Sequence, residues 1–265
     1  MSIDKVQAGG CYAERLGGCG GGLSREHPAS EAVLKEIDQG DGVEVSGMSW
    51  LPPGAIRALP PSALASRVLC RRHNSYLSPN DKMAARAFSA IGAAIRMANG
   101  EGAAIPTKQI EPNLFGGWIL KWFCGLAFSG QPTDPAGKRV DLALEEEWIQ
   151  ALFGQQPWPS RWNTAFLRSG ASPVYTKGGG LEISPLHVGE RIAAIEVLLH
   201  GIRFALFLGT VPRTLEGAQV IPFPLRLAFT SLRTQAASYV DFTAQGWVVP
   251  PTIITFQFTG EEQPD

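Results

Sequence analysis

The sequence predicts an α+β protein built from three successive parts. They are a metal-stabilised module over residues 1–100, a helical segment over 101–170 and an antiparallel β region over 171–265. Cysteines and histidines cluster near the start, and apolar residues recur at helical spacing in the middle. After Pro173, runs of β-branched and aromatic residues alternate with Gly and Pro breaks. With 45% hydrophobic and 18% charged residues, the chain has the composition of a globular protein with a sizeable core.

The cysteines and histidines of the first part have the chemistry and spacing of zinc ligands. Two residues separate Cys70 from His73, which lets both side chains reach one ion, and a glycine-rich loop links Cys11 to Cys19. We therefore expect one structural zinc, held by Cys11, Cys19, Cys70 and His73. In the alternative interpretation, Cys11 and Cys19 are surface thiols and Cys70 is an ordinary buried cysteine.

Helical patterns follow the first part of the chain. Pro79 and Asp81 favour a helix start after Ser78, and a stripe of small apolar residues then runs to the Asn99-Gly100 stop. Leu114 to Phe128 is apolar nearly all round, which predicts a central buried helix. Shorter elements complete this part: helices over 31–37 and 142–153, a strand within 40–47 and an irregular proline-rich loop over 51–61.

The sequence of the C-terminal part, residues 171–265, predicts β-strands. The expected antiparallel meander has its clearest hairpin at His200-Gly201, between two runs of alternating apolar residues. The predicted strands cover residues 181–186, 191–199, 202–208, 225–229, 239–242 and 252–258.

Charge and apolar runs bear on location and partners. The net charge is −1, so the chain lacks the strong basic field of many nucleic-acid binders, although basic residues crowd around residues 67–86. The start lacks the apolar core of a signal peptide, and Lys121 interrupts the longest apolar stretch, which is too short to span a bilayer. We therefore expect a cytoplasmic protein with no membrane partner, in which clustered cysteines bind metal rather than form disulfides.

Two segments carry a family resemblance. Leu23–His27 reads LSREH, and Leu69–Asp81 reads LCRRHNSYLSPND. With the preceding cysteines they resemble the zinc-containing HNH, or ββα-metal, nucleases. They are also similar to a group of uncharacterised bacterial proteins with LSREH followed by LC-x-x-HNS-x-LS-x-x-D. The resemblance covers roughly the first 90 residues and implies an HNH-like, treble-clef-like zinc module.

The HNH resemblance also implies roles for individual residues. His27 would act as general base on water, while Glu26 and Asn74 would bind Mg²⁺ at a phosphodiester. The family has Asp where Glu26 stands, and Leu16 occupies the place of an expected cysteine. Flanking phosphates of DNA or RNA would contact Arg71, Arg72 and Lys82.

Two functions from different classes therefore stay open. The first is a zinc-stabilised, HNH-like protein that acts on nucleic acid, as a Mg²⁺-dependent endonuclease with His27 as base. The second is a non-catalytic zinc-binding module whose other parts bind a partner protein or a small ligand. In the second, Glu26 and His27 form a hydrogen-bonded pair that orients their loop. The local basic cluster favours the first function and the near-neutral net charge favours the second.

Overall fold

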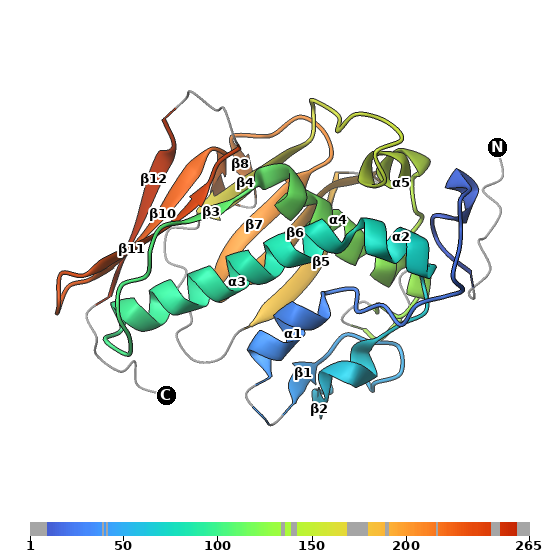
Figure 1. Ribbon diagram of the computed structural model, residues 1–265, viewed down its shortest axis with the longest axis horizontal. Helices are drawn as coiled ribbons and strands as arrows, with labels where there is room; N and C mark the ends of the chain where they lie inside the picture. Colours follow the sequence, from blue (N-terminus) through green and yellow to red (C-terminus); the bar gives the residue numbers. More distant parts are fainter. Residues whose placement is uncertain are drawn as a thin grey trace. The chain divides into compact units, whose positions relative to one another are not determined.

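The computed structural model describes residues 10–38, 40, 42–133, 136–138, 142–168, 180–188, 191–215, 217–244 and 250–258 (Figure 1). The chain forms two compact units, each made from two separate segments. Unit 1 contains Met1–Lys82 and Gly117–Pro159, and unit 2 contains Met83–Gly116 and Ser160–Asp265. Both long helices, α3 (Ser78–Ala98) and α4 (Pro112–Ser129), contribute residues to each unit.

Unit 1 is irregular and mostly helical. The predicted helix over 31–37 and the predicted strand within 40–47 are confirmed, whereas the loop predicted over 51–61 contains a strand. That strand, β2, pairs antiparallel with β1, so Val43 lies opposite Leu59. The remaining elements of unit 1 are η1 (Glu14–Leu16), α1 (Glu31–Ile37), β1 (Val43–Val45), β2 (Arg57–Leu59), η2 (Pro61–Leu64), α2 (Arg71–Tyr76) and α5 (Glu146–Leu152).

Helix α4 supplies the core of unit 1, as its apolar sequence predicts. Trp118, Ile119 and Leu120 are inaccessible to solvent, and the ring of Phe123 packs edge-on against Trp148 of α5 at 5.8 Å between centroids. Lys121 is equally buried in the same helix. Among the described residues, no helix has the length and apolarity needed to cross a membrane.

Unit 2 contains two sheets. The predicted antiparallel meander is confirmed for β5, β6 and β7, which are successive neighbours in a six-stranded antiparallel sheet in the order β5-β6-β7-β4-β9-β8. It is wrong for the strands predicted over 225–229, 239–242 and 252–258, which lie in another sheet. A second, four-stranded sheet in the order β12-β10-β11-β3 is mixed, because β10–β12 and β11–β3 pair in parallel. The strands are β3 (Lys108–Ile110), β4 (Asn163–Arg168), β5 (Leu181–Val188), β6 (Arg191–Leu199), β7 (Ile202–Phe207), β8 (Thr214–Leu215), β9 (Ala218–Pro222), β10 (Leu225–Ser231), β11 (Ala237–Phe242) and β12 (Thr252–Phe258).

The β6–β7 hairpin turns where the sequence predicts, and its turn residue is part of the core of unit 2. His200 has a left-handed backbone with φ 49°, and its ring centroid lies 4.0 Å from that of Phe88 on α3. Its Nε2 lies 3.0 Å from the Phe88 carbonyl oxygen, which accepts a hydrogen bond from the neutral imidazole. Burial lowers the pKa of His200 to about 4, so the ring stays neutral at physiological pH.

The hairpin can approach α3 this closely because residue 92 is glycine. A Cβ there would lie 3.0 Å from both Cε1 and Nε2 of His200. We expect Gly92→Ala to lower the free energy of unfolding by about 1–3 kcal/mol despite alanine's higher helix propensity, because the ring is fixed and cannot retreat. Urea unfolding checks this, with Gly102→Ala as control, since no atom lies within 4 Å of a Cβ at that position. Equal stability of the two variants would contradict the packing argument.

Candidate metal centre and a buried ion triad

The four side chains predicted to bind zinc converge on one point in unit 1. The sulfurs of Cys11, Cys19 and Cys70 and one ring nitrogen of His73 all lie within 4.8 Å of one another. Sulfur to Nδ1 distances are 3.3 Å from Cys11, 3.6 Å from Cys19 and 3.4 Å from Cys70. In a tetrahedral zinc site with bonds of about 2.3 Å to sulfur and 2.0 Å to nitrogen, these atoms are about 3.5 Å apart. The four residues therefore lie close enough to bind a metal ion such as zinc.

Local backbone structure explains how distant residues meet. Cys70 is the N-cap of α2, and its sulfur accepts a hydrogen bond from the backbone N–H of His73 at 3.4 Å. The two-residue spacing therefore places both ligands on one helical turn. On the other side, the loop that carries Cys19 has positive φ angles at Gly17 and Gly18, which glycine adopts without strain.

The four candidate ligands differ in their proton affinity. Burial, and then the charge of neighbouring Arg72, lowers the pKa of His73, which keeps the imidazole neutral and its lone pair available. Partial desolvation and the sulfurs of Cys11 and Cys70 raise the pKa of Cys19 to about 12. Burial opposes ionisation of Cys70 too, but backbone N–H groups of His73 and Gly20 lower its pKa overall. A divalent cation would displace the protons of these thiols and stabilise the thiolates, so metal binding at the cluster depends on pH.

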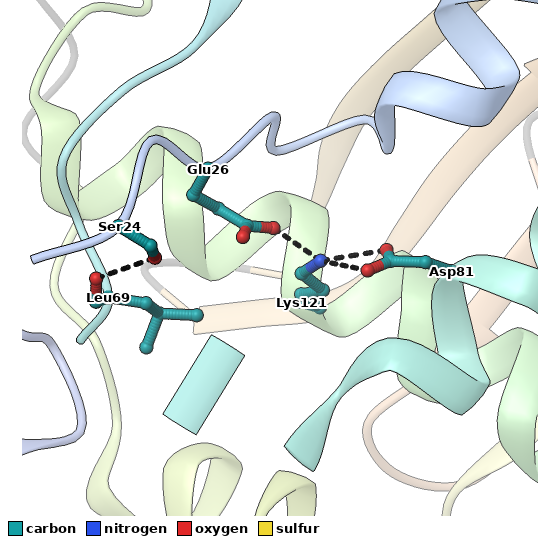
Figure 2. A network of polar contacts seen from close by, with 5 residues as sticks. All are labelled: Ser24, Glu26, Leu69, Asp81 and Lys121. Carbon is teal, nitrogen blue, oxygen red and sulfur yellow. Dashed lines mark hydrogen bonds and ion pairs between the residues drawn. The ribbon is translucent and has the colours of Figure 1, made fainter. Parts of the chain in front are cut away.

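Pairing between the two motif segments aligns the cluster. Residues 22–26 run antiparallel to residues 66–71, with bridges from Leu23 to Cys70 and from Glu26 to Ser66. Ser24 binds Leu69 twice: its backbone N–H donates to the Leu69 carbonyl at 2.8 Å. Its hydroxyl donates to the same carbonyl at 2.9 Å (Figure 2). The LSREH segment therefore acts as a short strand that supports the segment leading into Cys70.

Glu26 occupies the far end of that strand and belongs to a buried ion triad (Figure 2). The ammonium group of Lys121 donates to Glu26 and to both carboxylate oxygens of Asp81, at 2.7 and 2.6 Å. Lys121 is 1% exposed, Glu26 4%, and the side chain of Asp81 23%. One cation thus faces two carboxylates, and the triad carries a net negative charge when both are ionised.

This excess of negative charge affects the acidity of both carboxyl groups. Burial raises the pKa of Glu26 to about 7; the pairing with Lys121 opposes this rise and the charge of Asp81 adds to it. Burial also raises the pKa of Asp81. Near neutral pH the triad therefore binds a proton readily, because protonating one carboxyl group leaves one carboxylate for one ammonium ion.

The other predicted catalytic residues lie in different surroundings. His27 follows Glu26, is half-buried, and its Nε2 is buried without a hydrogen-bond partner among the described residues. Burial lowers the pKa of His27; the charge of Glu31 opposes this shift, and the charges of Arg25 and Lys121 add to it. Asn74 lies in α2, where its backbone N–H bonds to the Cys70 carbonyl. The carboxylate of Glu26, predicted to bind Mg²⁺, is paired with Lys121.

The predicted phosphate contacts are all exposed. Arg71 and Arg72 are the first two residues of α2, and Lys82 lies near the start of α3. Both arginines lie against the glycine-rich loop: the guanidinium carbon of Arg72 is 3.6 Å from where a Cβ of Gly18 would stand, and the Cβ of Arg71 is 3.1 Å from that of Gly21.

Lys121 is the site residue that motif reasoning missed. Its sequence signal is a single charge within the longest apolar run, which predicts either an interrupted helix or a buried charge with partners. Its two carboxylate partners are the acids of the two motif segments, Glu26 and Asp81, so the motifs and α4 form one site.

Comparisons with known proteins add no assignment: no protein-family model, no curated protein and no solved structure matches this chain.

Zinc content should depend on each ligand of the cluster. We expect one zinc per chain in the wild-type protein and less than one tenth of that in Cys70→Ala after dialysis, because three ligands bind zinc far more weakly than four. Elemental analysis measures this. Cys124→Ala is the matched control: Cys124 is fully buried in α4 and lies outside the cluster, so zinc should be retained. Equal zinc in both variants would contradict the assignment.

The ion triad should make the stability of the protein depend on pH. Between pH 4.5 and about 7, folded Glu26 binds a proton that the unfolded chain releases, so its contribution to stability decreases as pH rises through this window. In Glu26→Gln that contribution is absent. The difference in unfolding free energy between wild type and Glu26→Gln should therefore change by on the order of 3 kcal/mol between pH 5 and 8, in favour of the variant at pH 8. Urea titrations of both proteins with metal bound test it, and a constant difference would contradict the raised pKa.

Proposed function

We propose that this protein is a zinc-stabilised, HNH-like nucleic-acid-binding protein in which the zinc has a structural role. The observation that carries the proposal is the Cys₃His cluster, whose four ligand atoms lie within 4.8 Å of one another. Four protein ligands complete a tetrahedron, so no position stays open for a water molecule or a substrate. Catalytic zinc sites, in contrast, have three protein ligands and an open position.

Exposed basic side chains next to the cluster support nucleic acid as the partner. Arg71 and Arg72 lie between the ligands Cys70 and His73 in the sequence, and neither makes an ion pair with any residue that the structure describes. The guanidinium group of Arg72 lies against Gly18, and the aliphatic part of Arg71 lies against Gly21. Exposed guanidinium groups are suited to bind phosphate oxygens, which carry most of the affinity for nucleic acid. Lys82, also exposed, adds a third positive charge.

The ion pair of Glu26 favours nucleic-acid binding without a Mg²⁺ ion at this carboxylate. In the HNH-type reaction Glu26 would be a Mg²⁺ ligand, but here its carboxylate is 4% exposed and paired with Lys121. Binding Mg²⁺ would require breaking that ion pair and leaving the ammonium group of Lys121 with one partner instead of two. His27 keeps the neutral imidazole that a general base needs, since burial lowers its pKa.

Removal of the two arginines tests the proposal. We expect Arg71→Gln/Arg72→Gln to bind a labelled DNA or RNA oligonucleotide at least tenfold more weakly at 0.1 M salt. Each phosphate contact that is lost means that fewer counterions are released when the complex forms. The plot of the logarithm of the association constant against the logarithm of the salt concentration should also become less steep, by about 2 in the magnitude of its slope. Fluorescence anisotropy over a salt series measures both quantities.

A matched control removes the same charge elsewhere. Arg57 on β2 and Arg191 on β6 are exposed, so Arg57→Gln/Arg191→Gln should bind nearly as wild type does. Equal losses in both double variants would indicate nonspecific charge attraction. A wild-type protein that binds zinc but no nucleic acid would overturn the proposal in favour of a zinc module for a protein or small-molecule partner. Cleavage of the oligonucleotide with Mg²⁺, lost in His27→Ala, would extend it to an endonuclease.

A further inference from the structure

The metal ligands Cys70 and His73 lie on a chain segment that is fixed at both ends. The segment runs from Ser66 to Asp81, and its first residue pairs with Glu26: each backbone N–H donates to the other's carbonyl, at 2.8 and 2.6 Å. Its last residue, Asp81, lies in the first turn of α3. One end of the segment is therefore an acidic residue, Asp81, and the other end, Ser66, is paired with the acidic residue Glu26.

A single nitrogen atom joins these two ends. The Nζ of Lys121 contacts Glu26 and both carboxylate oxygens of Asp81, and it projects between them from α4 (Figure 2). Because Lys121 is 1% exposed, water does not compete for these bonds. The ammonium group thus sets the separation between the strand that supports Cys70 and the helix that follows His73.

The other half of the cluster is attached to the same segment. The backbone N–H of Tyr12, next to Cys11, donates to the Val68 carbonyl at 2.9 Å. The loop after Cys19 is attached through Gly20 and Gly22, whose carbonyls accept from the backbone N–H groups of Arg72 and Arg71 at 3.3 and 2.9 Å. All four ligands therefore depend on the position of residues 66–72.

We propose that Lys121 is a positioning residue for the metal centre: by binding Glu26 and Asp81 together, it sets the ligand geometry of a site that it does not touch. The inference rests on the proposed zinc site and extends it to α4. Residues that orient metal ligands typically change metal affinity by about 10- to 100-fold when they are replaced.

The test compares zinc affinity in Lys121→Met and wild type by competition with a chromophoric chelator at pH 8. Far-UV circular dichroism shows that each protein measured is folded. We expect the variant to bind zinc about 10- to 100-fold more weakly. Co²⁺ loaded in place of zinc should show weaker ligand-field absorption in the variant, because a distorted or incomplete tetrahedron absorbs less.

Two further variants separate positioning from simple loss of stability. Leu34 of α1 is 4% exposed, so Leu34→Ala leaves a cavity in the core of the same unit and lowers its stability. Its zinc affinity should stay within threefold of wild type. The triple variant Glu26→Gln/Lys121→Met/Asp81→Asn removes all three charges, so no buried carboxylate lacks a partner. The triple variant should be more stable than Lys121→Met, while its zinc affinity stays low. If Lys121→Met is unfolded, the triple variant takes its place in the comparison with wild type.

These measurements test the positioning role of Lys121 separately from the existence of the zinc site. Wild-type zinc affinity in the triple variant would overturn the positioning role, since charge balance alone would then explain the single variant. Equal losses of affinity in Leu34→Ala and Lys121→Met would overturn it as well. Absence of zinc binding in the wild-type protein would remove the proposed metal centre itself, and the inference with it.

Discussion

The structure of unit 1 depends on one buried positive charge. Removing an ammonium group from water costs several kcal/mol, which only close anionic partners can offset. Lys121 is the one charged residue of its helix, so its anionic partners must come from other elements. They are Glu26 from the strand-like LSREH segment and Asp81 from the start of α3. Because hydrophobic contacts tolerate many arrangements and this triad tolerates few, it specifies how the segments of the unit pack.

Local patterns in the sequence predict much of the fold. The helices α1, α3 and α4 and the β6–β7 hairpin lie where periodicity and turn residues indicate, because each is determined by neighbours within a few positions. The strand β2 was missed since three residues between prolines give no alternation to detect. The parallel pairings of β10 with β12 and of β11 with β3 join distant segments, and no local pattern encodes them.

The candidate site divides in the same way. Cys70 and His73 are predictable because helix geometry alone brings them together, and Cys11 and Cys19 could be added from ligand chemistry. The role of Glu26 could not be predicted, because its partner lies about a hundred positions further along the chain and a carboxylate next to a histidine has the same local pattern in a metal site and in an ion pair. Burial distinguishes these two roles, and burial is a property of the folded chain.

The thiol of Cys70 serves both the helix and the cluster, as N-cap acceptor for His73 and as a candidate metal ligand. A six-residue helix such as α2 is not stable alone, since helix nucleation costs more than so few hydrogen bonds return. A metal ion bound at its first turn would supply the missing stabilisation and would fix the direction of the side chains at positions 71 and 72. Loss of the metal would therefore change the direction of these two basic side chains as well as the stability of the helix that carries them.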